Sequence, residues 1–297
     1  MSGEDFFALL VSGLTTGAIY AMVGVSLNIA YKPTNVFNMA QGGLIMLGMM
    51  FTWVLLSVLG LPWILGVPLA MAIVAAVGLV EERIAVAPLH NVAGHSHAWV
   101  ITTLAFSIIL VNAADQIWGA DPRYVAPMPG TSLTHHRFGI VGFNTAQIAI
   151  IVIAFASIWL VEYFYHHTRL GRAVLAVSED SDGARLCGIN PLRLTMGSFA
   201  AGGAFAALTG AIASPILFAS TEFGLDLLIK GFIALAIGGL GSNWGALAGA
   251  ILIACIETLS SVYLSPGMRQ IALLAVFLAV LLMRPNGMFG RPGGREV

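Results

Sequence analysis

The chain has 297 residues, of which 58% are hydrophobic and only 9% are charged, and its formal net charge is −1. Soluble domains carry about 25% charged residues, so this composition favours a membrane protein over a soluble one. The near-neutral charge provides no basic surface for nucleic acid. Cys187 lies in a polar stretch and Cys255 in an apolar run, so no pair is visible for a disulfide or for redox chemistry.

Apolar segments follow one another along the chain as candidate membrane spans. The N-terminus, MSGED, is acidic, whereas a secretory signal begins with positive charge, so we predict that the first span is retained. A crossing helix needs about 20 residues, so the short run 229–240 either is extended by its neighbours or re-enters. We predict an all-α polytopic membrane protein of about 8–9 transmembrane helices, some short or discontinuous, forming one domain over 1–297. The predicted spans are 6–30, a run ending near 59, 61–80, 99–118, 145–165, 194–218, 229–240, a run ending near 263, and 269–283.

Two connections are expected at the membrane surface. The third span is expected to stop at Glu81-Glu82-Arg83, and an amphipathic segment with three histidines follows it at 84–97. The second connection, 121–143, is rich in proline, glycine and charge.

A polar stretch at 166–192, HHTRLGRAVLAVSEDSDGARLCGINPL, interrupts the apolar chain. Its charges cannot lie in hydrocarbon, because each would cost roughly 2.5–3.5 kcal/mol at the centre of a span. Ser178 or Asp180 can cap a second short helix after a first one at 171–177. Gly188 can end that second helix in the left-handed conformation, and Pro191 hinders its continuation. The stretch is therefore either a structured docking loop of two short helices or an ordinary amphipathic surface loop.

Two polar, glycine-containing breaks stand beside incomplete apolar runs, one in each half of the chain. They are NVFNMAQGG at 35–43 and GGLGSNWGALAG at 238–249. Discontinuous helices in corresponding places indicate inverted repeats with a path near the midplane, and irregular backbone at that depth must face protein or water. A pair of interfacial turns would explain the same pattern.

Polar residues inside predicted spans are functional candidates by default. Glu257 lies deep in the eighth segment, where either a solute path or contacts with the neighbouring hydroxyl side chains would explain it. Asn28 lies in the first span. Asn112 and Asp115 lie towards the outer end of the fourth span, where water can solvate them.

The motifs of several enzyme classes are missing from the sequence. Both lysines, Lys32 and Lys230, lack the glycine-rich context of a phosphate-binding loop, so ATP hydrolysis by that machinery would need another chain. Neither His-Glu-x-x-His nor Gly-x-Ser-x-Gly occurs. The histidine pairs 135–136 and 166–167 are sequence neighbours, which point apart on a helix and make poor chelates. We therefore predict neither a metal site nor a cofactor.

Several motifs resemble one family. Asp182-Gly183-Ala184 followed by Gly188 resembles the Glu-Ala-Ala-x-x-x-Gly coupling motif of bacterial ABC importer permeases. The segment RLCGIN at 185–190 is similar to the corresponding segment of the branched-chain amino-acid permeases of the LivH type. The run 38–42, NMAQG, resembles the Asn-Phe-Ala-His-Gly element of that family, and RPNGMFG at 284–290 resembles its Arg-Pro-x-Gly-Leu-Phe-Gly terminus.

The sequence also departs from these patterns. Asp182 replaces the usual glutamate and Gly183 the usual alanine. Gln41 stands where the family has histidine and Gly43 where it has glutamate, so a charge-dependent role of those two positions would be lost here.

The resemblance implies a permease subunit of an ABC importer, translocating a branched-chain or other hydrophobic amino acid. It implies four kinds of partner: two ABC ATPase subunits docking on the loop at 166–192, a paralogous permease in a pseudo-symmetric pair, a periplasmic or lipid-anchored binding protein, and membrane lipid. The residues expected to couple to the ATPase are Arg172, Glu179, Asp182, Ala184, Arg185 and Gly188. The residues expected to line the solute path are Asn28, Asn38, Gln41, Gly42, Gly202, Gly203 and Glu257.

Positive charge predicts the orientation. With 166–192 inside the cell, most arginines fall on the inner side, which agrees with the positive-inside rule and places the N-terminus outside and the C-terminus in the cytoplasm. Two other classes stay open on sequence alone: a stand-alone ion-coupled secondary transporter, and an intramembrane enzyme. The substrate also stays open among branched-chain amino acids, urea, amides and aromatic acids.

Overall fold

The computed structural model describes residues 3–89, 96–134, 136–138, 141–284 and 287–289. Helices dominate the described chain, and two three-residue strands form an antiparallel hairpin in which Arg137 pairs with Gly142. The long helices are α1 (Gly3–Thr34), α2 (Gln41–Trp53), α3 (Trp63–Glu81), α4 (Ser96–Trp118), α5 (Thr145–His167), α8 (Pro191–Leu217), α9 (Phe223–Gly238), α10 (Asn243–Tyr263) and α11 (Pro266–Met283). The shorter elements are the π-helices Val54–Val58 and Glu82–Val86, the 3₁₀-helix Ala87–Leu89, the strands β1 (His136–Phe138) and β2 (Val141–Phe143), and the helices α6 (Arg169–Glu179) and α7 (Ser181–Leu186).

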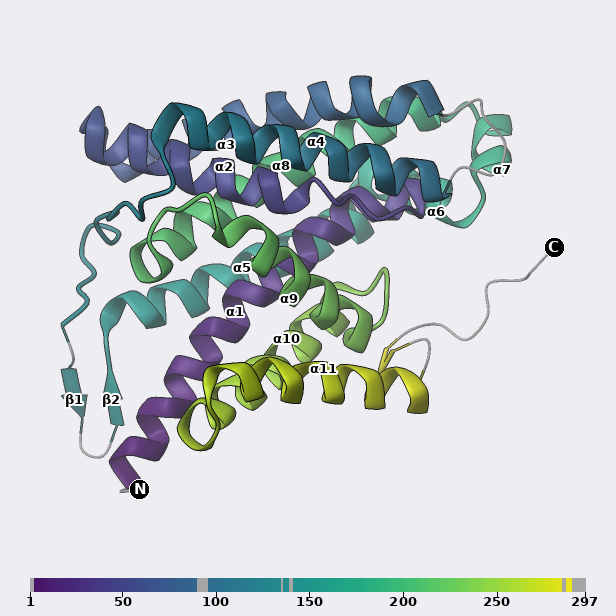
Figure 1. Cartoon of the computed structure of the whole chain (residues 1–297). Helices are drawn as coiled ribbons and strands as arrows, with labels where there is room; N and C mark the ends of the chain where they lie inside the picture. The colour runs from purple at the N-terminus through teal and green to yellow at the C-terminus, as the bar shows by residue number, and fades with distance from the viewer. Residues whose placement is uncertain (1–2, 90–95, 135, 139–140, 285–286, 290–297) are drawn as a thin grey trace. The chain divides into compact units, whose positions relative to one another are not determined.

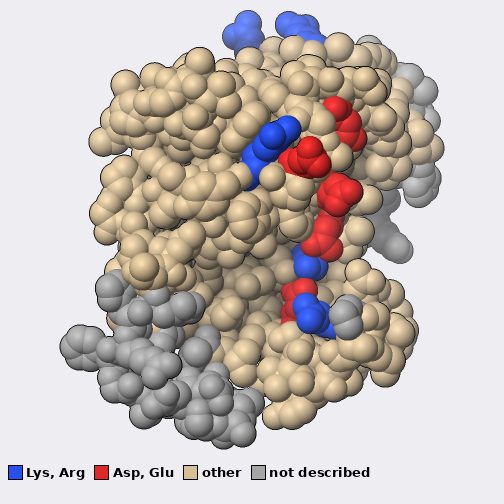
Figure 2. Space-filling model, turned by 60° about the vertical axis from the view of Figure 1, so that its left-hand side comes forward, with Lys and Arg blue, Asp and Glu red and all other residues tan. Residues whose placement is uncertain are grey.

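The helices are long and apolar enough for a membrane protein. Within the described residues, seven helical segments could cross a bilayer, and Gly267–Met283 forms a shorter apolar helix. Uncharged residues cover most of the surface shown in Figure 2, as expected where helices face lipid. The prediction of an all-α polytopic membrane protein is confirmed.

The chain divides into two compact units. Unit 1 consists of Met1–Val25, Pro127–Ile158 and Ile229–Val297, and unit 2 of Ser26–Ala126 and Trp159–Leu228. The prediction of one transmembrane domain over 1–297 stays a prediction.

Unit 2 is a bundle around α8, which packs against α2 and α3, while α4 packs on α2 (Figure 1). Small residues make this packing possible, because they let backbones approach closely. A Cβ atom on Gly203 would lie 2.6 Å from the Val74 carbonyl oxygen of α3, and one on Gly210 would lie 2.5 Å from the Ile45 carbonyl oxygen of α2. The short helices α6 and α7 lie at one end of this bundle (Figure 1).

Small residues also allow close helix packing in unit 1. A Cβ on Gly17 of α1 would lie 3.2 Å from the Ile251 Cα of α10. The break between α9 and α10 contains Gly239 and Gly241, both with positive φ, and Ser242 caps α10 by accepting a hydrogen bond from the Gly245 backbone N–H at 3.0 Å. The second glycine-rich break is therefore a tight turn between two helices.

Several predicted helix boundaries differ from those of the structure. The third span does not stop at Glu81-Glu82-Arg83, because the π-helix and the 3₁₀-helix continue it and the span runs over Trp63–Leu89. Residues 90–95 of the expected surface segment lie outside the described residues. Helix α1 continues past the predicted end of the first span to Thr34, with Pro33 in its last turn. The short run 229–240 was expected either to be extended by its neighbours or to re-enter, and it is extended: it belongs to α9, a 16-residue helix that begins at Phe223.

Candidate functional site

The polar stretch at 166–192 folds as two short capped helices. Thr168 caps α6, since its hydroxyl oxygen accepts from the Gly171 backbone N–H at 2.9 Å. Asp180 caps α7, since one carboxylate oxygen accepts from the backbone N–H groups of Asp182 (3.0 Å) and Gly183 (2.9 Å). Two neighbouring caps leave few backbone donors unsatisfied in so short a loop. The predicted helix pair, with Asp180 as the cap of the second helix, is confirmed.

The end of the loop is also fixed locally. Gly188 has φ +80°, the left-handed conformation expected after a helix, and the Ile189 N–H donates back to the Ala184 carbonyl at 3.0 Å. Pro191 was expected to hinder the continuation of the second short helix, and it also starts the next one. It occupies the first turn of α8, behind an Asn190 side chain that accepts from the Arg193 N–H at 3.3 Å. The loop is therefore joined to the next span without a flexible linker.

The loop exposes its charged side chains and buries only some of its apolar ones. Five of the six predicted coupling residues are exposed: Arg172, Glu179, Asp182, Arg185 and Gly188. The sixth, Ala184, is buried with Val174 and Val177, so it packs the loop rather than presenting a contact. Leu186 was not predicted to matter, yet it is 91% exposed. Its position in the coupling motif next to Arg185 was the signal that sequence reasoning overlooked.

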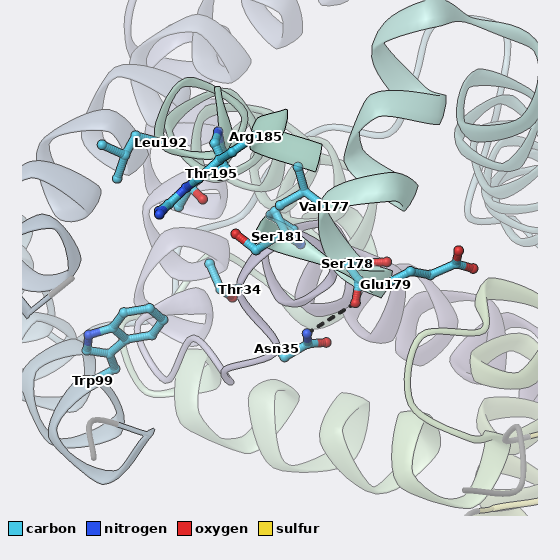
Figure 3. A pocket seen from close by; sticks show the side chains of 12 residues that line it. Thr34, Asn35, Trp99, Val177, Ser178, Glu179, Ser181, Arg185, Leu192 and Thr195 are labelled. Carbon is cyan, nitrogen blue, oxygen red and sulfur yellow. Dashed lines mark hydrogen bonds between the residues drawn. The ribbon is translucent and has the colours of Figure 1, made fainter. Parts of the chain in front are cut away.

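A hydrogen bond connects this loop to the link between α1 and α2. The Asn35 side-chain amide donates to the Ser178 carbonyl oxygen at 3.3 Å (Figure 3). Asn35 has φ +54°, which a non-glycine residue adopts only at a cost. A polar cavity of about 280 Å³ lies beside this contact, lined by both short helices, the end of α1, Trp99 of α4 and Thr195 of α8 (Figure 3). Glu179 points away from the other side chains drawn there.

The same link leads into a buried polar network at the start of α2. Asn38 accepts from the Ala40 backbone N–H at 2.8 Å, and its side-chain amide donates to the Gln41 side-chain oxygen at 3.2 Å. The Gln41 amide in turn donates to the Gly202 carbonyl of α8 at 2.9 Å. Asn38 and Gln41 are 2% and 0% exposed. The structure therefore brings three predicted path residues together and shields them from solvent.

The remaining path candidates in unit 2 are buried or serve packing. Asn28 is completely buried in α1. A Cβ on Gly42 would lie 2.6 Å from the Gly224 carbonyl oxygen, so this position, like Gly203, needs glycine for close helix contact.

Glu81 is a further buried polar residue that sequence reasoning missed. Its side chain is completely buried and interacts with Asn38, but neither carboxyl oxygen has a regular hydrogen-bond partner within the described residues. An ionisable group so placed is costly and marks a functional candidate. Glu81 was not predicted as a functional residue because the acidic pair 81–82 was interpreted as the end of a span.

Glu257 lies in unit 1, where it forms its own cluster. It accepts from the Tyr20 hydroxyl at 2.7 Å and from the Lys230 ammonium at 3.0 Å, so groups on α1, α9 and α10 meet. The Lys230 and Glu257 side chains are 19% and 16% exposed. The hydroxyl groups that follow Glu257 were proposed as its partners, but the structure gives it Tyr20 and Lys230 instead. Among the residues that the structure describes, no three histidine, cysteine or acidic side chains gather to hold a metal ion.

These features define a multi-pass helical membrane protein that carries a structured, charged pair of helices between two of its spans. The family of the branched-chain amino acid transport system permease component matches residues 9–281, and the chain belongs to this family. It is therefore a transport subunit and not an enzyme.

Two curated relatives match over nearly their whole length. The chain is 30% identical to the high-affinity branched-chain amino acid transport system permease protein LivH of Salmonella typhimurium, covering 98% of each chain. It is 29% identical to the permease protein BraD of Pseudomonas aeruginosa, covering 97% of each. It is also 25% identical to the Salmonella typhimurium permease protein LivM, covering 92% of this chain and 68% of that one. No solved structure matches this chain.

Proposed function

We propose that the chain is the permease subunit of an ABC importer that carries a branched-chain or other hydrophobic amino acid across the inner membrane. The observation that carries this proposal is the match to LivH-type permeases over 98% of both chains. Its partners would be two ATPase subunits, a solute-binding protein and a second permease. The likeness to LivM as well as to LivH supports a paralogous permease as the second one.

The loop at 166–192 is the docking site for the ATPase in this proposal. A soluble partner would find exposed charges on both short helices and exposed apolar side chains, of which Leu186 on α7 is the most exposed. Such a surface combines an apolar anchor with a polar rim. The caps at Thr168 and Asp180 would let the loop move as a rigid body.

The link from Asn35 to Gln41 would transmit that movement. It receives the Ser178 contact at one end and holds the Gly202 carbonyl of α8 at the other. A displacement of α6 would therefore pull on the α2 start and on α8. The solute path would run past Asn38, Gln41 and Gly202, with Asn28 nearby in sequence on α1, and it is closed in this conformation because these side chains are buried. Glu257 stays a path candidate within unit 1.

The stand-alone ion-coupled transporter is the weaker interpretation. The chain belongs to a permease family, and Glu257, the carboxylate that such a transporter would use, is already paired with Lys230 and Tyr20. For the orientation, we propose a cytoplasmic loop and C-terminus and an external N-terminus, supported by the arginine distribution.

The test is solute-stimulated ATP hydrolysis by the complex reconstituted with its binding protein and ATPase subunits. Asp182→Arg and Gly188→Pro should abolish the stimulation while the chain still inserts, because the first reverses an exposed charge and the second cannot adopt a positive φ. Asp121→Arg, a matched charge reversal at an exposed position outside the loop, should leave hydrolysis unchanged. Full stimulation in both loop variants would remove the docking assignment.

The substrate is tested on the cognate binding protein. Calorimetric titration with leucine, isoleucine and valine, and separately with urea, an amide and an aromatic acid, should give heat of binding for the branched-chain group. Binding of urea or the amide alone would assign a different solute to the same permease architecture.

A further inference from the structure

A large apolar groove runs along α8 in unit 2, away from the polar network. Its volume is about 620 Å³, and its lining comes mainly from α8 and α5, with contributions from α1, α3 and α6. This volume falls within the roughly 300–1,000 Å³ of ordinary small-molecule sites. The walls include Leu160 and Phe164 of α5, which are 61% and 41% exposed. An open, apolar hollow on a membrane helix bundle favours an apolar occupant, lipid or protein, over water.

Small side chains on one face of α8 create the hollow. Gly197, Ala201 and Ala204 recur at three- and four-residue spacing, which places them on the same side of the helix. A Cβ on Gly197 would meet no atom within 4 Å, unlike one on Gly203, which would collide with α3. Gly197 therefore borders open space and not a neighbouring helix of this chain, and that space can take another occupant.

The groove has one charged end. It extends along α8 from Arg193, in the first turn, to Phe205. The twelve helical steps between these two residues rise about 18 Å, and one leaflet of the hydrocarbon core is about 15 Å thick. Arg193 is thus placed where a head group would lie, close in sequence to the charged loop, and the apolar walls continue to the depth of acyl-chain ends.

We propose that this groove binds a phospholipid, with one acyl chain along the small face of α8 and an anionic head group at Arg193. Charge complementarity selects the head group, because an arginine beside an apolar groove recognises the phosphate of an anionic lipid. The proposal rests on the proposed orientation only in assigning the lipid to the cytoplasmic leaflet, and it does not depend on the solute.

A helix of a second permease fits the groove less well. A helix with side chains is about 10–12 Å wide, so 18 Å of it would fill roughly 1,400 Å³ or more. That volume exceeds the groove more than twofold, so a partner helix would cover the groove and not enter it. An acyl chain is thin enough to lie between Gly197 and the α5 side chains.

The experiment uses the full chain in complex with its partners, reconstituted into vesicles of phosphatidylcholine and phosphatidylglycerol. The phosphatidylglycerol carries a photoactivatable acyl chain. After illumination, the label should map to peptides containing Leu160–Tyr165 and Gly197–Phe205. Gly197→Leu, which fills open space, should lose most of this label. Arg193→Gln should lose the preference for phosphatidylglycerol over an equally labelled phosphatidylcholine.

Matched controls come from the same chain. Gly267→Leu also adds a side chain in open space, and Arg284→Gln removes another exposed arginine, and both should keep the label. An unchanged thermal midpoint would show that each variant is folded. Undiminished labelling of Gly197→Leu would overturn the proposal, as would crosslinking of a photoreactive residue at position 160 to a second permease and not to lipid. Because labelling needs neither ATP nor solute, its failure is distinct from a loss of solute-stimulated hydrolysis.

Discussion

Glu257 is stabilised inside an apolar helix by two donors that come from other helices. The Lys230 ammonium and the Tyr20 hydroxyl each take one of its carboxylate oxygens, and the ammonium also lies 5.2 Å from the centre of the Tyr20 ring. Removing one member of a buried ion pair is costlier than removing both, since the remaining charge loses its partner.

Lys230→Met should therefore destabilise the protein more than the double variant Lys230→Met/Glu257→Gln does. Breaking a fully buried pair costs about 3–5 kcal/mol, and the cost here should be smaller because both groups are 16–19% exposed. Thermal unfolding midpoints in detergent would give the relative stabilities of the single and the double variant. A double variant less stable than Lys230→Met would contradict a paired role for these two charges.

Sequence reasoning found some of these polar side chains and missed their partners. Glu257 stands out because it interrupts an apolar run, whereas nothing local connects it with Tyr20, which is 237 residues away. Gln41 was found through its family resemblance, but its bond to the Gly202 carbonyl depends on how α2 and α8 pack. Glu81 was missed because a charged pair usually marks the end of a span, whereas here a π-helix continues the span and the Glu81 side chain is completely buried.

Asn35 has a positive φ, and its side chain donates a hydrogen bond to the Ser178 carbonyl. Two substitutions separate the effect of the backbone conformation from that of the hydrogen bond. Asn35→Gly keeps the positive φ and loses only the hydrogen bond to Ser178, a loss of about 0.5–1.5 kcal/mol or less. Asn35→Ala loses both and adds roughly 1–2 kcal/mol of backbone strain. Thermal midpoints should follow the order wild type, Gly, Ala.

The two variants also test whether this contact transmits movement. If it does, both should uncouple ATP hydrolysis from solute uptake to a similar extent, although their stabilities differ. Coupling that follows stability would instead assign Asn35 a purely structural role.

Helix α8 separates two uses of small residues on opposite faces. On one side, Gly210 lies against the α2 backbone, and on the other, Gly197 borders open space. Sequence patterns such as the many glycine and alanine residues of this helix indicate close helix packing. They could not say which glycine packs against which neighbour, since that depends on rotation of the helix about its axis.

Gly210→Ala should destabilise the protein by about 1–3 kcal/mol, because its methyl group would lie 2.5 Å from the Ile45 carbonyl oxygen and 2.7 Å from the Met49 nitrogen. Gly197→Ala is the control in the same helix and should be neutral or slightly stabilising, since alanine favours helix. Unfolding of both variants in detergent, followed by circular dichroism, measures the difference. Equal unfolding midpoints of the two variants would contradict this prediction and show that α2 shifts to accommodate the added methyl group.

For the whole molecule, composition and charge predicted a polytopic helical membrane protein. They did not predict where each helix ends, because the ends depend on capping residues and on short π- or 3₁₀-helices that continue a span. An apolar chain with one charged interruption leaves few alternatives to a polytopic helical protein. The ends at Leu89 and Pro191 differ from expectation because a π-helix extends one span and an Asn190 cap starts another. The arginine distribution is the basis of the proposed orientation in the membrane.

Cys187 offers a native probe of that orientation, because it is exposed on the charged loop. In a Cys255→Ser background, a membrane-impermeant thiol reagent added to spheroplasts, whose inner membrane is intact, should leave Cys187 unmodified until the membrane is opened. A cysteine at Asp121, an exposed position that follows α4, should react at once if the positive-inside rule sets the topology. Asp121→Cys combined with Cys187→Ser, and Cys187 alone, give the two signals separately. Immediate modification of Cys187, with Asp121→Cys protected, would place the charged loop outside, where no ATPase could reach it.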